Sequence, residues 1–174
     1  MNTNSFLSLG HRPEVLEAAD LAAKQFGAGP GAVRFIDGTF TSHTDLEEGI
    51  AGFVGKSAAT IFNSAYTANL GLALTLHNKT TYWVGDELNH NCIIRAMRIA
   101  NVPRENKAIY AHNDMDQLRE HLQNVPDGID RVIVIFDGVF SMRGDVAPLT
   151  EINALAKEHH DRLPHGVITV VDDS

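Results

Sequence analysis

Acids, amides and hydroxyls follow several apolar runs of this chain, at the points where those runs end. Val171 is followed by Asp172 and Asp173. The comparable segments are Asn63-Ser64-Ala65-Tyr66 after Phe62, Gly85-Asp86-Glu87-Leu88-Asn89-His90 after Val84, and Asp137-Gly138-Val139-Phe140-Ser141 after Phe136. The carboxyl ends of parallel strands share one edge of a sheet, where open α/β proteins bind their ligands. These polar groups are therefore predicted to converge on one crevice.

Several of these residues fit more than one role. Free backbone N–H groups at a helix that begins near Ser64 would hold a phosphate, or Ser64 would only cap that helix. A single histidine such as His90 is more often a surface or core residue than a functional one, and only its position in the crevice favours a role. Asp172 fits a helix cap, a metal ligand or a charge partner for a cationic ligand atom.

The periodicity of apolar residues predicts the elements that position these groups. Helices are predicted over residues 13–26, 44–53, 66–76, 88–100, 115–122 and 149–160, and strands over residues 58–62, 81–84, 108–111, 132–136 and 167–171. Pro13 suits the first turn of its helix, Gly27 would end that helix, and Asn113 would cap the one that starts at Met115. This alternation predicts an α/β fold with a mostly parallel sheet sandwiched by helices.

Other patterns in the chain carry no chemistry. Gly27-Ala28-Gly29 resembles part of a dinucleotide-binding motif, but it follows a helix instead of a strand. His159 and His160 lie at a predicted helix end, where they favour the helix dipole and solvent. No spacing of His and Cys typical of a metal site is present, so no bound metal is expected. The Gly-x-Ser-x-Gly turn of many hydrolases is also missing from the sequence.

Composition limits the remaining classes of protein. The 174 residues are 44% hydrophobic and 21% charged, which is typical of a globular domain. The net charge of −8, without a basic cluster, argues against nucleic-acid binding. No apolar stretch is long enough for a membrane span, and no signal peptide is recognisable. The single Cys92 cannot form an internal disulfide, so a cytoplasmic location is expected.

Five motifs, in order along nearly the whole chain, resemble the α-oxoamine synthases, which are fold-type I enzymes that use pyridoxal 5′-phosphate (PLP). This family includes 2-amino-3-ketobutyrate CoA ligase, 8-amino-7-oxononanoate synthase and serine palmitoyltransferase. The motifs are the opening Asn4-Ser5-Phe6-Leu7-Ser8-Leu9, the glycine-rich segment 27–43 with Val33-Arg34-Phe35-Ile36-Asp37-Gly38-Thr39, the segment Asp86-Glu87-Leu88-Asn89-His90-Asn91-Cys92, the segment Asp137-Gly138-Val139-Phe140-Ser141-Met142, and Val171-Asp172-Asp173-Ser174.

The resemblance implies a cofactor, PLP, and a role for each matching residue. The segment Ser64-Ala65-Tyr66 would bind the cofactor phosphate, mainly through the backbone amides of Ala65 and Tyr66. His90 would stack on the pyridine ring and contact the substrate, and Asp172 would pair with the protonated ring nitrogen. Ser141 would bond near the phenolic oxygen, and Asn4 would touch the substrate. His90 and Asp172 are accordingly the expected catalytic residues.

The implied reaction condenses a small amino acid with an acyl-CoA to give an α-amino ketone, in a homodimer. Residues 1–40 would form an N-terminal segment, and residues 41–174 an incomplete PLP-binding large domain. The family's Schiff-base lysine is expected beyond Ser174, so the chain is interpreted as part of a longer enzyme and as inactive alone. Arg143 stands where many relatives have Asp. The alternatives are a non-catalytic subunit, or another fold-type I enzyme such as an aminotransferase or lyase.

Overall fold

The computed structural model describes residues 5–174, so the predicted substrate residue Asn4 lies outside the described part. The chain divides into two compact units, Met1–Ile61 and Phe62–Ser174. Among the described residues, no helix is long and apolar enough to cross a membrane.

The first unit is helical. It contains the 3-10 helix η1 (Phe6–His11), α1 (Pro13–Phe26), the π-helical turn η2 (Arg34–Gly38) and α2 (Thr41–Phe53). The prediction for α1 is confirmed: Pro13 opens it, and Gly27 ends it with φ +82°, a conformation that glycine adopts without strain. The ring of Phe26 stacks on Phe40 with centroids 5.3 Å apart.

Helix α2 begins three residues before its predicted start. The Phe40 N–H donates to Nδ1 of His43 at 2.9 Å, and this bond caps the earlier turn. Arg34 holds Glu47 of this helix through two hydrogen bonds of 2.6 and 3.0 Å. The bonds from Arg34, aided by one from the Ile61 N–H, lower the pKa of the Glu47 carboxyl to about 2.

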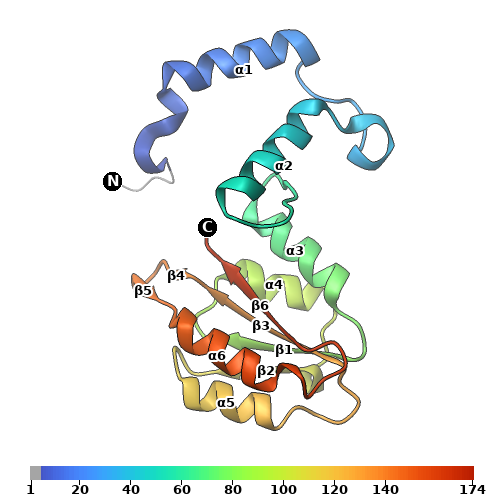
Figure 1. The fold of residues 1–174 in the computed structure, drawn as a ribbon, viewed down its shortest axis with the longest axis vertical. Coiled ribbons are helices and arrows are strands. Elements are labelled where there is room, and N and C mark those ends of the chain that lie inside the picture. The colour runs from blue at the N-terminus through green and yellow to red at the C-terminus, as the bar shows by residue number, and fades with distance from the viewer. Residues whose placement is uncertain (1–4) are drawn as a thin grey trace. The chain divides into compact units, whose positions relative to one another are not determined.

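The second unit is a four-stranded parallel sheet with helices on both faces (Figure 1). Its elements are α3 (Ala65–Leu76), β1 (Thr81–Asp86), α4 (Asn91–Ile99), η3 (Arg104–Asn106), β2 (Lys107–Tyr110), α5 (Met115–Gln123), β3 (Arg131–Asp137), β4 (Val139–Phe140), β5 (Asp145–Val146), α6 (Leu149–His160) and β6 (Val167–Asp172). The strand order is β2-β1-β3-β6, and β4 and β5 form a separate antiparallel hairpin. The predicted α/β class is confirmed.

Alternate residues of the central strands fill two cores. Trp83, Ile133 and Ile135 pack with residues of α3 and α4 on one face. Val84, Val132 and Val134 pack with residues of α5 and α6 on the other face. Because both faces are covered, β1 is buried along its whole length, as continuous apolar strands of parallel sheets are. The rigid sheet fixes the positions of the strand ends.

Three sequence predictions need correction. Residues 58–62 do not form a strand, since the Ile61 N–H bonds the Glu47 carboxylate instead of a neighbouring strand. The cap of α5 is Asp114, which accepts from the Gln117 N–H, and not Asn113. Helix α4 starts at Asn91 instead of residue 88, because Asp86 accepts the Leu88 N–H and holds the preceding residues in a turn.

Candidate active site

The three longest strands of the sheet each end in an aspartate. Asp86 ends β1, Asp137 ends β3 and Asp172 ends β6. All pairings are parallel, and Asp137 lies in register with Asp172. The predicted convergence is therefore confirmed for these three strand ends, where it follows from the topology alone. It is not confirmed for residues 63–66 as a strand end, because residues 58–62 form no strand.

Asp172 is half-buried and accepts hydrogen bonds on both carboxylate oxygens. Oδ2 accepts from the Asn69 side-chain amide at 2.7 Å and from the Cys92 thiol at 3.5 Å. Oδ1 accepts from the Ser174 hydroxyl at 2.6 Å. Desolvation raises the pKa of Asp172, but the hydrogen bonds from Ser174, Asn69 and Cys92 outweigh it and the net shift is downward. Asp172 is thus an anion at neutral pH.

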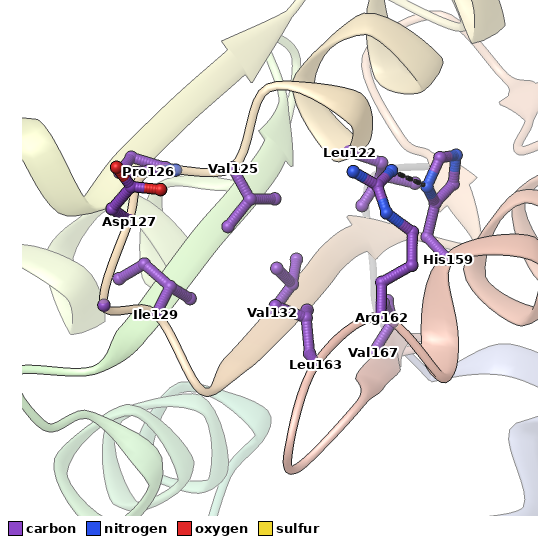
Figure 2. A pocket seen from close by; sticks show the side chains of 11 residues that line it. Leu122, Val125, Pro126, Asp127, Ile129, Val132, His159, Arg162, Leu163 and Val167 are labelled. Atoms are coloured by element: carbon purple, nitrogen blue, oxygen red, sulfur yellow. Dashed lines mark hydrogen bonds between the residues drawn. The ribbon is translucent and has the colours of Figure 1, made fainter.

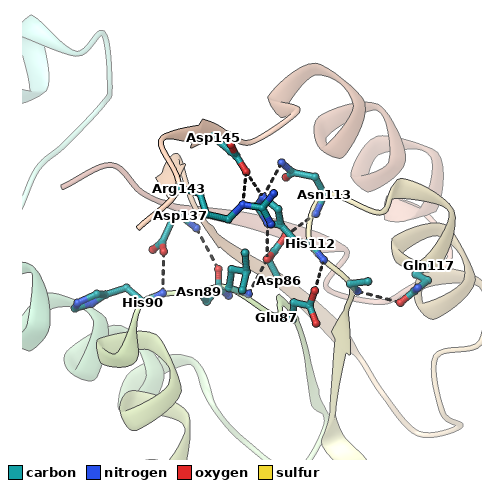
Figure 3. A network of polar contacts seen from close by, with 12 residues as sticks. Asp86, Glu87, Asn89, His90, His112, Asn113, Gln117, Asp137, Arg143 and Asp145 are labelled. Carbon is teal, nitrogen blue, oxygen red and sulfur yellow. Dashed lines mark hydrogen bonds and ion pairs between the residues drawn. The ribbon is translucent and has the colours of Figure 1, made fainter. Parts of the chain in front are cut away.

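His90 caps α4 and presents an exposed ring beside this anion. Its backbone N–H donates to Asp137 Oδ2 at 2.8 Å (Figure 3), and its Nδ1 accepts from the Cys92 N–H at 3.3 Å. The Cys92 sulfur lies 2.9 Å from the same Nδ1. Cys92 therefore connects the His90 ring to the Asp172 carboxylate. Its contacts with Nδ1 fix the orientation of that ring.

Ser141 lies with His90 in one pocket of about 310 Å³. The pocket is lined by Leu88, Asn89, His90, Asn91, Asp137, Phe140, Ser141, Met142 and Arg143. Ser141 is in the turn between β4 and β5. Burial raises the pKa of the Asp137 carboxyl at the base of the pocket, although the hydrogen bond from His90 opposes that shift.

The start of α3 contains both features that the sequence left as alternatives, a capping serine and free backbone N–H groups. Ser64 is the N-cap, and its hydroxyl accepts from the Thr67 N–H at 3.2 Å. Within residues 5–174, no acceptor is found for the N–H groups of Ala65 and Tyr66. Ser64 is thus a cap, and the next two amides remain available to an anion at the positive end of the helix dipole.

The hairpin that carries Ser141 is tied to the sheet by a charged network (Figure 3). His112 contacts Asp86 through Nδ1 at 3.1 Å and Asp145 of β5 through Nε2 at 3.0 Å. Asp86 is buried and also accepts from the Asn113 N–H at 2.9 Å. Arg143 pairs with Asp145 at 2.9 Å. The ion pair with Asp145 holds Arg143 in place among the residues that line the pocket.

Sequence reasoning did not assign Asn69, the Cys92 thiol or His112 to the site, and it placed Asp137 in the crevice without giving it a role. One signal was readable: Asn69 is a polar residue inside the apolar helix of residues 65–76, and a buried amide needs partners. Its partner Asp172 is 103 residues away in the chain, so the pairing itself needs the structure.

A second pocket, of about 230 Å³, lies at the opposite end of the sheet (Figure 2). It is lined by residues near the starts of β3 and β6 and the ends of α5 and α6, among them Val132, Val167 and Leu163. His159 was expected in solvent, but it is buried, and Arg162 donates to its Nδ1 at 2.8 Å. Desolvation lowers the pKa of His159. None of the predicted site residues within positions 5–174 lines this pocket.

Comparisons with known proteins agree with this fold and with the sequence motifs. The sequence profile of the family described as aminotransferase class I and II matches residues 1–173. An 8-amino-7-oxononanoate synthase of Bacillus velezensis is 42% identical over 159 residues, which are 91% of this chain and 40% of that protein. One from Thermoanaerobacter pseudethanolicus is 38% identical over 174 residues, 100% of this chain and 42% of that protein.

Among solved structures, a serine palmitoyltransferase with its PLP internal aldimine has a TM-score of 0.87 and 31% identity over 98% of this chain and 40% of that one. The chain thus spans about two fifths of the length of the relatives that it matches. The profile match covers nearly every residue, and the motifs at the strand ends agree with the structural likeness. The chain therefore belongs to the aminotransferase class I and II family and, within it, to the α-oxoamine synthases of the PLP-dependent fold type I.

Proposed function

We propose that the protein carrying this chain is a PLP-dependent acyltransferase that condenses a small amino acid with an acyl-CoA to give an α-amino ketone. One observation carries the proposal. Asp172 and His90 both contact Cys92, and the start of α3, whose first two amides have no partner within residues 5–174, lies one helical turn before Asn69, which contacts Asp172. This is a site for a ligand with a phosphate at one end and a cationic ring atom at the other.

The donor set suits PLP. Ala65 and Tyr66 would hold the phosphate through their free N–H groups, because a helix start of this kind favours an anion. Asp172 would accept a hydrogen bond from the protonated ring nitrogen, and Ser141 would donate to the phenolic oxygen. When bound, PLP supplies an electron sink for the reacting carbon of the amino acid.

The side chains of the site would control that chemistry. The ionised Asp172 favours a protonated, electron-poor ring and therefore raises the capacity of that ring to accept electrons. The planar ring of His90 would cover one face of the cofactor, limit its tilt and exclude water. His90 Nδ1 accepts the Cys92 N–H, so the other ring nitrogen, Nε2, is free to contact substrate. Asn4 remains a proposed substrate contact.

We further propose that residues 41–174 are the first part of the PLP-binding domain, that residues 1–40 precede it, and that the lysine that attaches the cofactor belongs to the remainder of the protein. The chain covers 40% and 42% of two relatives, which supports a remainder that would contain this lysine. We also propose a homodimer and a cytoplasmic location. The buried, unpaired Cys92 suits a reducing compartment.

Thiol release tests the proposed reaction. The complete protein, loaded with PLP, is incubated with glycine, alanine or serine and with acyl-CoA donors of increasing chain length, and free CoA thiol is measured. We expect release that depends on both the amino acid and the donor. Reactions without amino acid measure simple thioester hydrolysis. Absence of thiol with every pair, together with amino transfer to a 2-oxo acid, would favour an aminotransferase instead.

A further inference from the structure

We propose that Asn69 is a positioning residue, which fixes the Asp172 carboxylate and, through Cys92, the ring of His90. The consequence for the site rests on the proposed function. The contact itself rests on the geometry of three elements that meet behind the strand ends: α3 supplies Asn69, α4 supplies Cys92 and β6 supplies Asp172.

The amide of Asn69 uses both of its N–H groups in this cluster. One lies 2.7 Å from Asp172 Oδ2 and the other contact is 3.3 Å to the Cys92 sulfur. Asn69 is 8% exposed and Cys92 is 2% exposed, so water does not compete for these bonds. A hydrogen bond from a buried neutral donor to a carboxylate is among the stronger ones in proteins.

Cys92 contacts both Asn69 and His90, so it connects the Asn69 amide to the His90 ring. Because its sulfur accepts from Asn69, its S–H is left to donate, and it has Asp172 Oδ2 at 3.5 Å and His90 Nδ1 at 2.9 Å within reach. Burial and the nearby Asp172 charge raise the pKa of the thiol, so it keeps its proton for this purpose. Both side chains proposed to contact the cofactor ring are thus held by one buried amide.

Helix α3 would then act at two ends of the ligand. Its first residues offer N–H groups to a phosphate, and Asn69 follows Ala65 by four residues, about 6 Å along the axis at 1.5 Å per residue. One rigid element would fix the distance between the phosphate site and the carboxylate site. A change at Asn69 should therefore disturb the ligand's ring end and leave its phosphate end in place.

The test compares Asn69→Leu, which keeps a branched side chain without polar atoms, with the matched control Asn106→Leu. The Asn106 amide also donates two hydrogen bonds, to the carbonyls of Lys79 and Thr81, but it lies next to the starts of β1 and β2. The Asp172 side-chain carboxyl is titrated by carbon NMR in the cofactor-free chain, and PLP binding is then measured by absorbance as a function of pH.

Removal of a hydrogen bond that lowers the Asp172 pKa should raise that pKa in Asn69→Leu and leave it unchanged in Asn106→Leu. PLP affinity at neutral pH should fall by about tenfold or more. The loss of PLP affinity on acidification should also begin at a higher pH than in the parent chain. If Asn69→Leu does not fold, Asn69→Asp keeps the shape and adds a like charge, so a larger upward shift is expected.

An Asp172 that titrates in the folded Asn69 variants as it does in the parent chain would overturn the proposal. A different result would contradict the proposed function without affecting the positioning role of Asn69. If the unmodified chain and the complete protein do not bind PLP, yet the Asp172 pKa depends on Asn69, then the positioning role stands and the assigned ligand is wrong.

Discussion

Replacement of Asp172 by alanine in the complete protein is expected to reduce turnover by roughly a thousandfold, the scale of losing a preorganised charge in an active site. In the proposed site the variant would leave the ring nitrogen without an anionic partner and so lower the capacity of the cofactor to accept electrons. It also leaves the buried Asn69 amide without its acceptor. The measurement is kcat with saturating substrates at several pH values.

Asp173→Ala is the matched control for this experiment. Asp173 is the adjacent acid, but it is exposed, and the structure gives it no role in the site. Its replacement should change kcat by no more than a few-fold. In the unmodified enzyme the hydrogen bonds keep the Asp172 pKa low, so the carboxylate is present at neutral pH, and its contribution is lost only as the pH falls through that pKa. Near-normal rates for Asp172→Ala at neutral pH would contradict the assigned role.

The second large effect is expected at His90, whose two proposed roles, stacking on the cofactor ring and contact with the substrate, can be separated by substitution. His90→Ala removes both, and we expect about tenfold weaker PLP binding and roughly a hundredfold lower kcat. His90→Phe keeps a planar ring but no nitrogen, so cofactor affinity should recover while kcat stays low. PLP affinity is read from absorbance and kcat from thiol release.

His121→Ala provides the control for this pair. His121 lies in the last turn of α5, away from Cys92 and Asp137, the two residues that hold His90. It should leave both quantities unchanged. Equal recovery of affinity and kcat in His90→Phe would mean that His90 acts only as a flat surface, and the proposed substrate contact would then be wrong.

The arrangement of strand ends could be predicted from the sequence because parallel topology imposes it. The apolar runs before Asp86, Asp137 and Asp172 are typical of strands in a parallel sheet, and such strands point the same way and end at the same edge. The positions of His90 and Ser141 followed from the same argument, and both line one pocket.

The contacts that hold the site together could not be predicted in this way. Asn69 and Cys92 lie 103 and 80 residues from Asp172 in the chain, and no local periodicity reports such a pairing. The error at residues 58–62 has a similar cause. A short apolar run reads as a strand by itself, but the Glu47 side chain takes the Ile61 N–H that a ladder would use. At this position the hydrogen bond to a side chain determined the backbone conformation.

The most direct test of the central claim is an NMR titration of the 174-residue chain with PLP, which follows the backbone amides. We expect the amides of Ala65, Tyr66, His90, Ser141 and Asp172 to shift together, with one dissociation constant. Val125, Ile129 and Leu163, which line the pocket at the far end of the sheet, should not move. Shifts confined to that far pocket, or separate dissociation constants for the start of α3 and for Asp172, would contradict it.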